Sequence, residues 1–240
     1  MDSLSFPDCI PVEKGFDHFF GTRQSPAPLI NILRVGQVTP VPPDYPHVIS
    51  LKQVHGKDVA VFDKPVDVAT PIPSDGDALV TNQPNVLLVV RTADCVPVLM
   101  VDVERRVVAA VHAGWRGAVA GIVPDTLLVL SERFGSIRDQ IRVAIGPSIG
   151  PCCFEVDEPV LRPLKEQFSF STDVLKTISS THAKLDLKAL IRYQLTEAGI
   201  EADAMRWSQD CTQCDAKRFF SYRREGQVNG TMISGIMMKA

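Results

Sequence analysis

Short apolar runs bounded by turn residues dominate the centre of the chain. The segment 86–102, VLLVVRTADCVPVLMVD, holds two such runs separated by Thr92–Cys95, and RVVAAVHAG follows at 106–114. Runs of this length, rich in β-branched residues and flanked by turn signals, are typical of buried strands. We therefore predict three strands here, the last ending on His112.

Strand-like patterns also occur nearer the N-terminus. HFFGTR at 18–23 predicts a strand that leads into a turn, and VISLKQVHG at 48–56 predicts another. DVAVF at 58–62 is predicted to be the hairpin partner of the second run. The segment 37–46, QVTPVPPDYP, is predicted to be an ordered loop, because proline lacks the backbone donor that regular structure needs.

Helical spacing appears later in the chain. In 118–134 the apolar residues Ile122, Leu127, Leu130 and Phe134 recur close to a helical period, and Gly135 provides a stop signal. Further segments are predicted as helices at about 158–168 and 186–198, and as closing strands at FFSYRR and GTMISGIMM.

The fold class follows from this alternation of strands and helices. It predicts a mixed α/β (α+β) sandwich, formed as a single domain over residues 1–240.

Composition and charge narrow the function classes. With 45 % apolar and 22 % charged residues, the chain can bury a substantial core without disulfide or metal support. The net charge of −3 argues against a nucleic-acid partner held by charge. The notable basic cluster is AKRFFSYRR at 216–224, which is expected to bind a small anion or to lie in solvent.

Cellular location and cysteine chemistry are linked. A run of about 18 apolar residues is absent, so no membrane span is expected. The N-terminal residues lack a basic region followed by an apolar stretch, so we expect no secretory signal and a cytoplasmic protein. The six cysteines are then reduced thiols, metal ligands or catalytic groups.

Three candidate metal ligands lie beside strands and turns: His55, Cys95 and His112. Two imidazoles and one thiolate suit zinc, and three protein ligands leave a fourth position open, as in catalytic sites. Their wide separation in the chain leaves a second interpretation, in which Cys95 is a small buried residue and the histidines are hydrogen-bonded loop groups.

Neighbouring residues have two possible roles each. Asp94 could orient a ligand or carry a proton, or it could cap a turn between strands. Trp115 and Arg116 could stack on and clamp a flat or anionic substrate, or they could fill the core and form a surface ion pair.

The other cysteine motif is CTQC at 211–214. Together with Cys152 and Cys153 it could form a four-thiolate zinc site or a redox pair. Adjacent residues of an extended chain point in different directions, so reduced structural thiols are the favoured interpretation. GPSIGP at 146–151 is interpreted as a structural turn.

Several of these segments together resemble a known family. LKQVHG, DGDALVT, TADCVPVL, AAVHAGWRG, AIGPSIGPCCFEV, LDLKALIRYQL and FFSYRREG occur in the order typical of YfiH-like proteins, over about residues 15–238. These proteins have been called laccase-domain, polyphenol-oxidase-like and purine nucleoside phosphorylase-like. The resemblance further implies a layered sandwich with mixed sheets.

The resemblance implies roles for particular residues. His55, Cys95 and His112 match the family's three zinc ligands, and Cys95 also matches a suggested hydrolase cysteine. Arg23 matches the arginine of a TR motif near the pocket. The implied activities are phosphorolysis of adenosine, inosine, guanosine or methylthioadenosine, and adenosine deamination. Arg23 and Arg116 are then candidates for the phosphate site, and Asp94 for the proton carrier.

The chain departs from the family pattern at a few positions. QSPAP follows GTR where a Gly-Gly turn is usual, and a proline loop replaces a helix within 24–47. Ile191 stands where asparagine is common, and Thr231 where arginine is common.

Other activities are attached to the same family pattern. Copper-dependent polyphenol oxidation is one, but five histidines are too few for a multicopper laccase, although two histidines and a cysteine could hold a single copper. A hydrolase that edits peptidoglycan precursors would use Cys95 or a zinc-bound water on an amide. A zinc-binding interaction protein is the non-enzymatic alternative.

Overall fold

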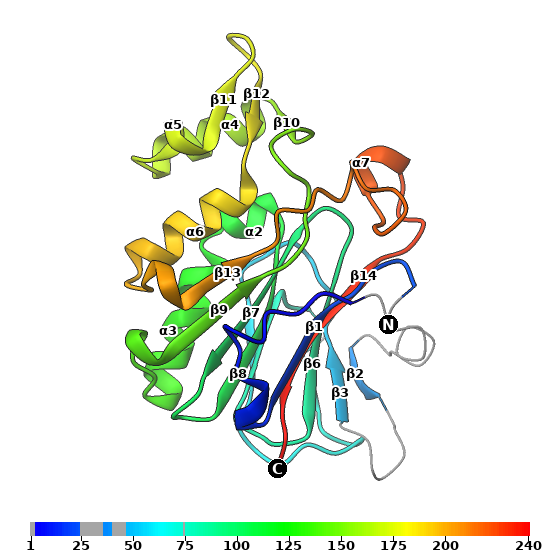
Figure 1. Ribbon diagram of the computed structural model, residues 1–240, viewed down its shortest axis with the longest axis vertical. Helices are drawn as coiled ribbons and strands as arrows, with labels where there is room; N and C mark the ends of the chain where they lie inside the picture. Colours follow the sequence, from blue (N-terminus) through cyan, green and yellow to red (C-terminus); the bar gives the residue numbers. More distant parts are fainter. Residues whose placement is uncertain (1–2, 25–35, 40–46, 74) are drawn as a thin grey trace.

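The computed structural model describes residues 3–24, 36–39, 47–73 and 75–240 of the chain. Three layers are visible in Figure 1: helices, a six-stranded sheet and a five-stranded sheet. In spatial order the six-stranded sheet contains β13 (Met205–Trp207), β9 (Ile141–Ile145), β7 (Val96–Asp102), β8 (Val107–Ala113), β5 (Ala78–Thr81) and β4 (Val59–Phe62). The five-stranded sheet contains β1 (Phe16–Phe20), β14 (Met232–Met238), β6 (Val86–Thr92), β3 (His47–Ser50) and β2 (Gln37–Thr39).

Helices cover the outer face of the six-stranded sheet and link it to a small third sheet. The α-helices are α2 (Trp115–Ala120), α3 (Ile122–Phe134), α4 (Glu158–Gln167), α5 (Ser171–Val174), α6 (Leu187–Glu197) and α7 (Tyr222–Glu225). Short 3-10 helices are η1 (Val12–Lys14), η2 (Arg138–Gln140) and η3 (Ala202–Ala204). The third sheet is β10 (Glu155–Val156), β12 (Ala183–Leu185) and β11 (Leu175–Thr177).

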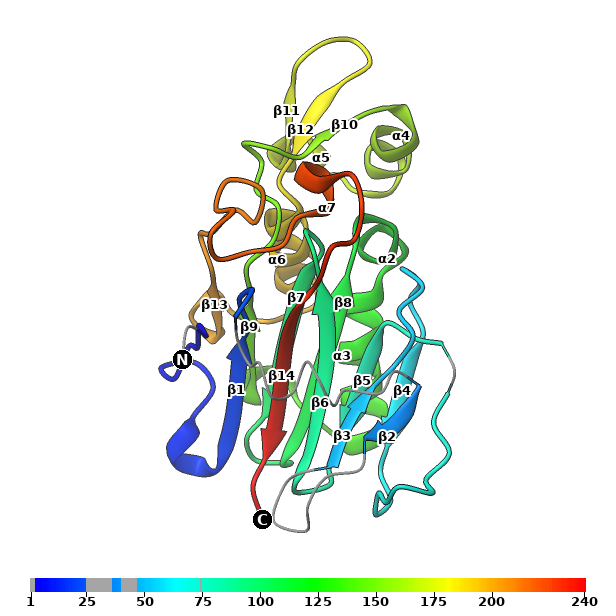
Figure 2. The same ribbon diagram turned by 90° about the vertical axis from the view of Figure 1, so that its right-hand side faces the viewer.

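The central strands β7 and β8 are buried on both faces. Val98 and Met100 pack into the core between the six-stranded sheet and the helices. Leu99 and Val101 pack into the core between the two large sheets, where β14 and β6 lie in front of them in Figure 2. Because side chains alternate along a strand, burial of both faces requires the continuous apolar runs seen in the sequence. The three predicted central strands are therefore confirmed.

Both large sheets are mixed, as predicted. The pairs β4–β5 and β9–β13 are parallel in one sheet and β3–β6 is parallel in the other, while the remaining ladders are antiparallel. The mixed α/β class is confirmed.

The predicted hairpin between 48–56 and 58–62 is wrong. β3 pairs with β6 in one sheet and β4 pairs with β5 in the other, so the intervening segment crosses between the sheets. The local alternation pattern cannot distinguish a hairpin from such a crossing. His55 lies within this crossing segment and is not part of a strand in either sheet.

Three further boundaries differ from the predictions. The first residues of the proline-rich segment form β2, whereas 40–46 lies outside the described residues. Gly121, with φ of 91°, divides the helix predicted over 118–134 into α2 and α3. FFSYRR is not a strand, because Ser221 accepts a hydrogen bond from the backbone N–H of Arg224 and caps α7.

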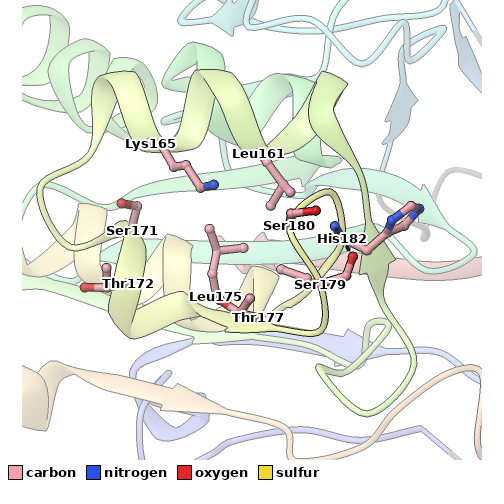
Figure 3. Close-up of a pocket in the computed structure, with 10 residues that line it drawn as sticks. Leu161, Lys165, Ser171, Thr172, Leu175, Thr177, Ser179, Ser180 and His182 are labelled. Atoms are coloured by element: carbon pink, nitrogen blue, oxygen red, sulfur yellow. Dashed lines mark hydrogen bonds between the residues drawn. The ribbon is translucent and has the colours of Figure 1, made fainter.

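The small third sheet, with α4 and α5, encloses a cavity of about 170 Å³. Figure 3 shows Leu161, Lys165 and the hydroxyl-bearing residues around it, with His182 at its edge. The sets of clustered metal-ligating side chains found in the described part of the chain lie elsewhere. No helix of the described residues has the length and apolar character needed to cross a membrane.

We predict that His18 on β1 makes the free energy of unfolding of this protein decrease in acid. His18 is 8 % exposed, and its Nε2 accepts the backbone N–H of Phe6 at 2.7 Å. Burial lowers the pKa of His18 to about 4. The unfolded chain takes up this proton near pH 6.5 and the folded chain does not, so stability falls as pH drops from about 6.5 to about 4, by roughly 3 kcal/mol.

His18→Gln keeps an acceptor for Phe6 and removes this titration. Urea unfolding at several pH values is expected to show a shallower loss of stability below pH 6.5 in the variant than in the wild type. Equal pH slopes for the two proteins would contradict the assignment.

Candidate metal and substrate site

Three segments distant in sequence bring His55, Cys95 and His112 together. One ligand atom from each lies within 4.8 Å of the others. The two imidazole rings meet edge to face, with centroids 4.8 Å apart and an interplanar angle of 80°. The structure therefore brings the predicted ligand set to one point.

Two of the ligands lie on crossings between the two large sheets, and the third lies within a strand. His55 lies between β3 and β4, Cys95 lies in the turn from β6 to β7, and His112 lies near the end of β8. His55 and Asp94 have φ of 61° and 93°, in the left-handed region that non-glycine residues rarely adopt. Backbone strain of this kind concentrates at functional sites, where the surrounding structure holds it.

Gly114 explains the break that follows β8. A Cβ at this position would lie 2.8 Å from His55 Cδ2 and 3.1 Å from Cys95 Sγ. A glycine here allows the backbone to approach both ligands, so any larger residue would displace His55 and Cys95.

Asp77 orients His112 and the backbone around His55. The sequence interpretation did not identify this residue. Its Oδ1 lies 2.7 Å from Nδ1 of His112, and the carboxylate accepts the backbone N–H groups of Val54, His55 and Gly56. A proton on Nδ1 leaves Nε2 of His112 free to bind a metal. The available signal was an aspartate directly before the apolar strand ALVT.

The electrostatics of the site favour a thiolate. Burial raises the pKa of Cys95, but hydrogen bonds from His112 and His55 outweigh burial and lower it to about 7. Burial lowers the pKa of His112, while its hydrogen bonds to Asp77 and Cys95 raise it to about 9. Thiolate character is what a cysteine needs as a nucleophile or a metal ligand.

The donor set fits a metal. Two imidazoles and a thiolate match the borderline-soft ligand preference of zinc, and a carboxylate on the far side of a ligating histidine is the usual supporting arrangement. Asp77 supplies that carboxylate, so both the ligands and their support are present among the described residues.

The three ligands open into a cavity of about 630 Å³, which residues of α2 and of α7 help to line. Trp115 and Arg116 line it, and the Arg116 guanidinium lies 4.4 Å from the centre of the Trp115 ring. The described lining residues are Gln53, His55, Arg91, Ala93, Asp94, Cys95, His112, Trp115, Arg116, Ile149, Phe154, Leu187, Tyr222, Arg223, Val228 and Thr231.

Arginines give this cavity a positive wall. Arg91 and Arg223 join Arg116 among the lining residues. The Nε of Arg91 is buried without a hydrogen-bond partner in the described structure, and burial lowers the pKa of this residue. A partly buried guanidinium whose Nε has no partner among the described residues is suited to an anionic ligand.

Sequence reasoning did not single out Arg91 or Arg223. Arg91 interrupts an otherwise apolar strand, which was a usable signal. Arg223 belongs to the basic cluster at 216–224, which was expected to bind a small anion or to lie in solvent.

Asp94 lines the cavity and connects two segments of its wall through hydrogen bonds. The carboxylate accepts hydrogen bonds from Thr212 Oγ1 at 2.6 Å, Ser221 Oγ at 3.0 Å and the backbone N–H of Arg223 at 2.7 Å. These bonds hold the segment that carries α7 against the turn that carries Cys95. Its role as a proton carrier stays a prediction.

Arg23 is not brought into the described lining of the cavity. Its guanidinium donates to Phe219 O at 2.9 Å, pairs with Glu225 and lies over the Phe220 ring. These contacts brace the segment that leads into α7, and a substrate-binding role for Arg23 stays a prediction.

The positions that depart from the family pattern lie in different parts of the structure. Ile191 is fully buried on α6 in the core against the helices, where an apolar side chain fits. Thr231 lines the cavity, and residues 25–35 and 40–46 of the segment 24–47 lie outside the described residues.

Comparisons with known proteins agree with this architecture. The family model described as multi-copper polyphenol oxidoreductase laccase matches residues 30–239. The chain is 36 % identical over 202 residues to "Adenosine deaminase RL5" from an unknown prokaryotic organism, covering 82 % of this chain and 77 % of that protein. It is 39 % identical over 163 residues to a "Purine nucleoside phosphorylase" of Bacteroides thetaiotaomicron, covering 68 % of this chain and 60 % of that protein.

A solved structure shares the fold. The crystal structure of the Bacillus licheniformis hypothetical protein YfiH has a TM-score of 0.79 and 26 % identity, with 93 % of each chain covered. The chain therefore belongs to the family described as multi-copper polyphenol oxidoreductase laccase, whose members include the YfiH-like proteins.

Proposed function

We propose that this chain is a zinc-dependent purine nucleoside phosphorylase that also deaminates adenosine. The observation that carries the proposal is one cavity holding both the His55, Cys95 and His112 ligand set and a wall of arginines. The names of the two relatives, adenosine deaminase and purine nucleoside phosphorylase, support the same pair of reactions. The substrates proposed are adenosine, inosine, guanosine and methylthioadenosine.

The metal site has defined protein roles in this proposal. His55, Cys95 and His112 would hold the zinc, and Asp77 keeps Nε2 of His112 directed toward it. Zinc held by three protein ligands supplies a Lewis acid that polarises an oxygen at the open position.

The remaining lining residues suit a nucleoside and an anion. Trp115, Phe154 and Tyr222 offer aromatic surface for a flat base, and the cavity volume of about 630 Å³ is in the usual range for small-molecule sites. Arg91, Arg116 and Arg223 would neutralise phosphate. In phosphorolysis a phosphate oxygen bonds to the ribose C1′ as the bond from C1′ to the base breaks.

Proton transfer is assigned to Asp94. It lies beside Cys95 in the cavity lining, and Thr212, Ser221 and the backbone of Arg223 fix its position. In deamination water adds to the purine C6 and ammonia leaves, so the reaction requires a group that moves a proton near the reacting carbon.

Copper-dependent polyphenol oxidation is less well supported by the donors. The clustered ligand sets found in the described residues are His55 with Cys95 and His112, and a set of four cysteines. Oxygen-reducing copper clusters need many imidazoles, and the whole chain has five histidines.

Incubation with adenosine, with and without phosphate, tests the proposal. We expect adenine and ribose 1-phosphate only when phosphate is present. Inosine should form in both cases, and phosphate should convert part of it to hypoxanthine. Absence of all these products, with zinc bound, would overturn the proposed function.

Arg91→Gln should separate the two reactions. Removal of one charged hydrogen-bond donor costs about 1.5–3 kcal/mol, so KM for phosphate should rise at least about tenfold. Adenosine deamination needs no phosphate and should change much less. Arg133→Gln is the matched control, because Arg133 pairs with Asp63 outside the cavity lining. Equal loss of both activities in Arg91→Gln would contradict the assignment of Arg91.

A further inference from the structure

A second thiol-rich site lies outside the catalytic cavity. Cys152, Cys153, Cys211 and Cys214 place their sulfur atoms within 4.8 Å of one another. We propose that these four cysteines bind one zinc ion in a closed structural site, separate from the His55, Cys95 and His112 set. This inference does not depend on the proposed enzymatic activity.

The sulfur spacing fits a tetrahedral metal. The Sγ of Cys214 lies 3.6 Å from that of Cys152 and 3.4 Å from that of Cys153. A zinc–sulfur bond of about 2.3 Å in a regular tetrahedron places the sulfurs about 3.8 Å apart. A disulfide needs about 2.05 Å and joins only two sulfurs, whereas Cys214 approaches two partners at once.

The turn at Cys152 and Cys153 removes the geometric objection to adjacent ligands. Backbone N–H groups of Cys153 and Phe154 both donate to Gly150 O, at 2.9 and 3.0 Å. The chain is therefore folded into a tight turn here, and neighbouring side chains do not point to opposite sides as they do in a strand. Both thiols can reach one ion.

Backbone contacts hold Cys211 and Cys214 beside Cys152 and Cys153. Thr212 N–H donates to Ser148 O at 3.0 Å, and the backbone N–H of Gly150 points at Cys211 Sγ at 3.2 Å. A backbone donor aimed at sulfur stabilises a thiolate, which is the form that binds metal. The CxxC spacing of 211–214 is a common zinc-ligand spacing.

Nearby lysines offset the charge of such a site. Zn²⁺ with four thiolates carries a net charge of about −2. Lys184 Nζ donates to Cys152 O at 2.5 Å, and Lys188 Nζ donates to Asp210 O at 2.8 Å beside Cys211. Two cations at the rim make the charged form of the cluster less costly.

The proposed zinc would hold the wall of the catalytic cavity. Thr212 follows Cys211 directly and donates to Asp94, while Arg224 Nη1 donates to Thr212 O at 2.8 Å. The four thiols thus join the turn after β9 to the segment that carries Thr212 and α7. Four protein ligands leave no open position, which is the pattern of structural and not catalytic zinc.

Metal analysis of the purified protein tests this directly. We expect about two zinc ions per wild-type chain, one in Cys214→Ser and one in Cys95→Ser. Cys9→Ala should keep both, because Cys9 is buried against Val143 O and Ala204 O and is not in either set. Cobalt loading should give strong thiolate charge-transfer absorption that falls sharply in Cys214→Ser and only slightly in Cys95→Ser.

A measurement on the wild type keeps the test decisive if Cys214→Ser does not fold. Titration with a thiol reagent and a zinc-sensitive dye should release the ion of this cluster as four thiols react. A wild-type chain with a single zinc that Cys95→Ser abolishes would overturn the proposal. So would disulfides among these four cysteines, or iron bound in place of zinc.

Discussion

Replacement of Cys95 by alanine is expected to reduce nucleoside phosphorolysis and deamination by at least about 10³-fold, and His112→Ala should do the same. A metal acting as a Lewis acid contributes several kcal/mol of transition-state stabilisation, and each 1.36 kcal/mol is a factor of ten in rate. Both side chains lie in the ligand set, and each also stabilises the charge of the other through their hydrogen bond. The measurement is kcat/KM for adenosine with and without phosphate, alongside zinc content.

The controls distinguish a lost metal from a lost fold. The core is extensive and the ligands lie at its edge, so both variants should retain the wild-type circular dichroism spectrum. Each should lose one zinc ion per chain, whereas Cys9→Ala should keep full activity. A Cys95→Ala protein that forms adenine and inosine as fast as the wild type would refute the site.

The central strands could be predicted because strands that are buried on both faces have continuous apolar sequences. Strands β7 and β8 need apolar residues on both faces, since one face meets the helices and the other meets the second sheet. That requirement produces runs that are easy to recognise. The long-range pairing of β14 with β6, or the crossing from β3 to β4, depends on contacts that no local pattern encodes.

The ligand triad shows a different limit. Spacing alone left the metal interpretation of His55, Cys95 and His112 open, and the family resemblance was needed to favour it. Their convergence depends on two crossings between the large sheets, on the place of His112 near the end of β8 and on the absence of a side chain at Gly114. These are properties of the folded backbone and not of any one segment.

Supporting residues were harder to identify than ligands. An aspartate before a strand and an arginine within one are common in sequences and do not by themselves indicate a function. Asp77 and Arg91 could therefore not be recognised from the sequence. Their roles depend on the buried partner of Asp77 and on the missing partner of Arg91 Nε within the described structure. At Cys152 and Cys153 the sequence interpretation rested on an extended chain, whereas the backbone makes a turn there.

Asp77→Asn is expected to weaken zinc binding by about 10–100-fold, the usual effect of removing the carboxylate behind a ligating histidine. Its carboxylate currently accepts from His112 Nδ1 and from three backbone N–H groups of the segment that carries His55. An asparagine has one acceptor oxygen and presents an NH₂ group in place of the other. When the NH₂ faces His112, Nδ1 must become the acceptor, and the ring proton moves to Nε2, where it blocks the metal.

Excess zinc separates this effect from general destabilisation. The activity of Asp77→Asn should recover in large part at high zinc concentration, because the ligands remain and only their orientation is weakened. Asp102→Asn is the matched control: Asp102 is also fully buried and also accepts backbone N–H groups, from Glu104 and Arg105. It ends β7 and pairs with Val107, at the end of β8 far from His112. This variant should leave zinc affinity unchanged. If both variants bound zinc as tightly as the wild type, His112 would not need Asp77 to present Nε2, and the geometry of the site would have to be set by Gly114 and the strand register alone.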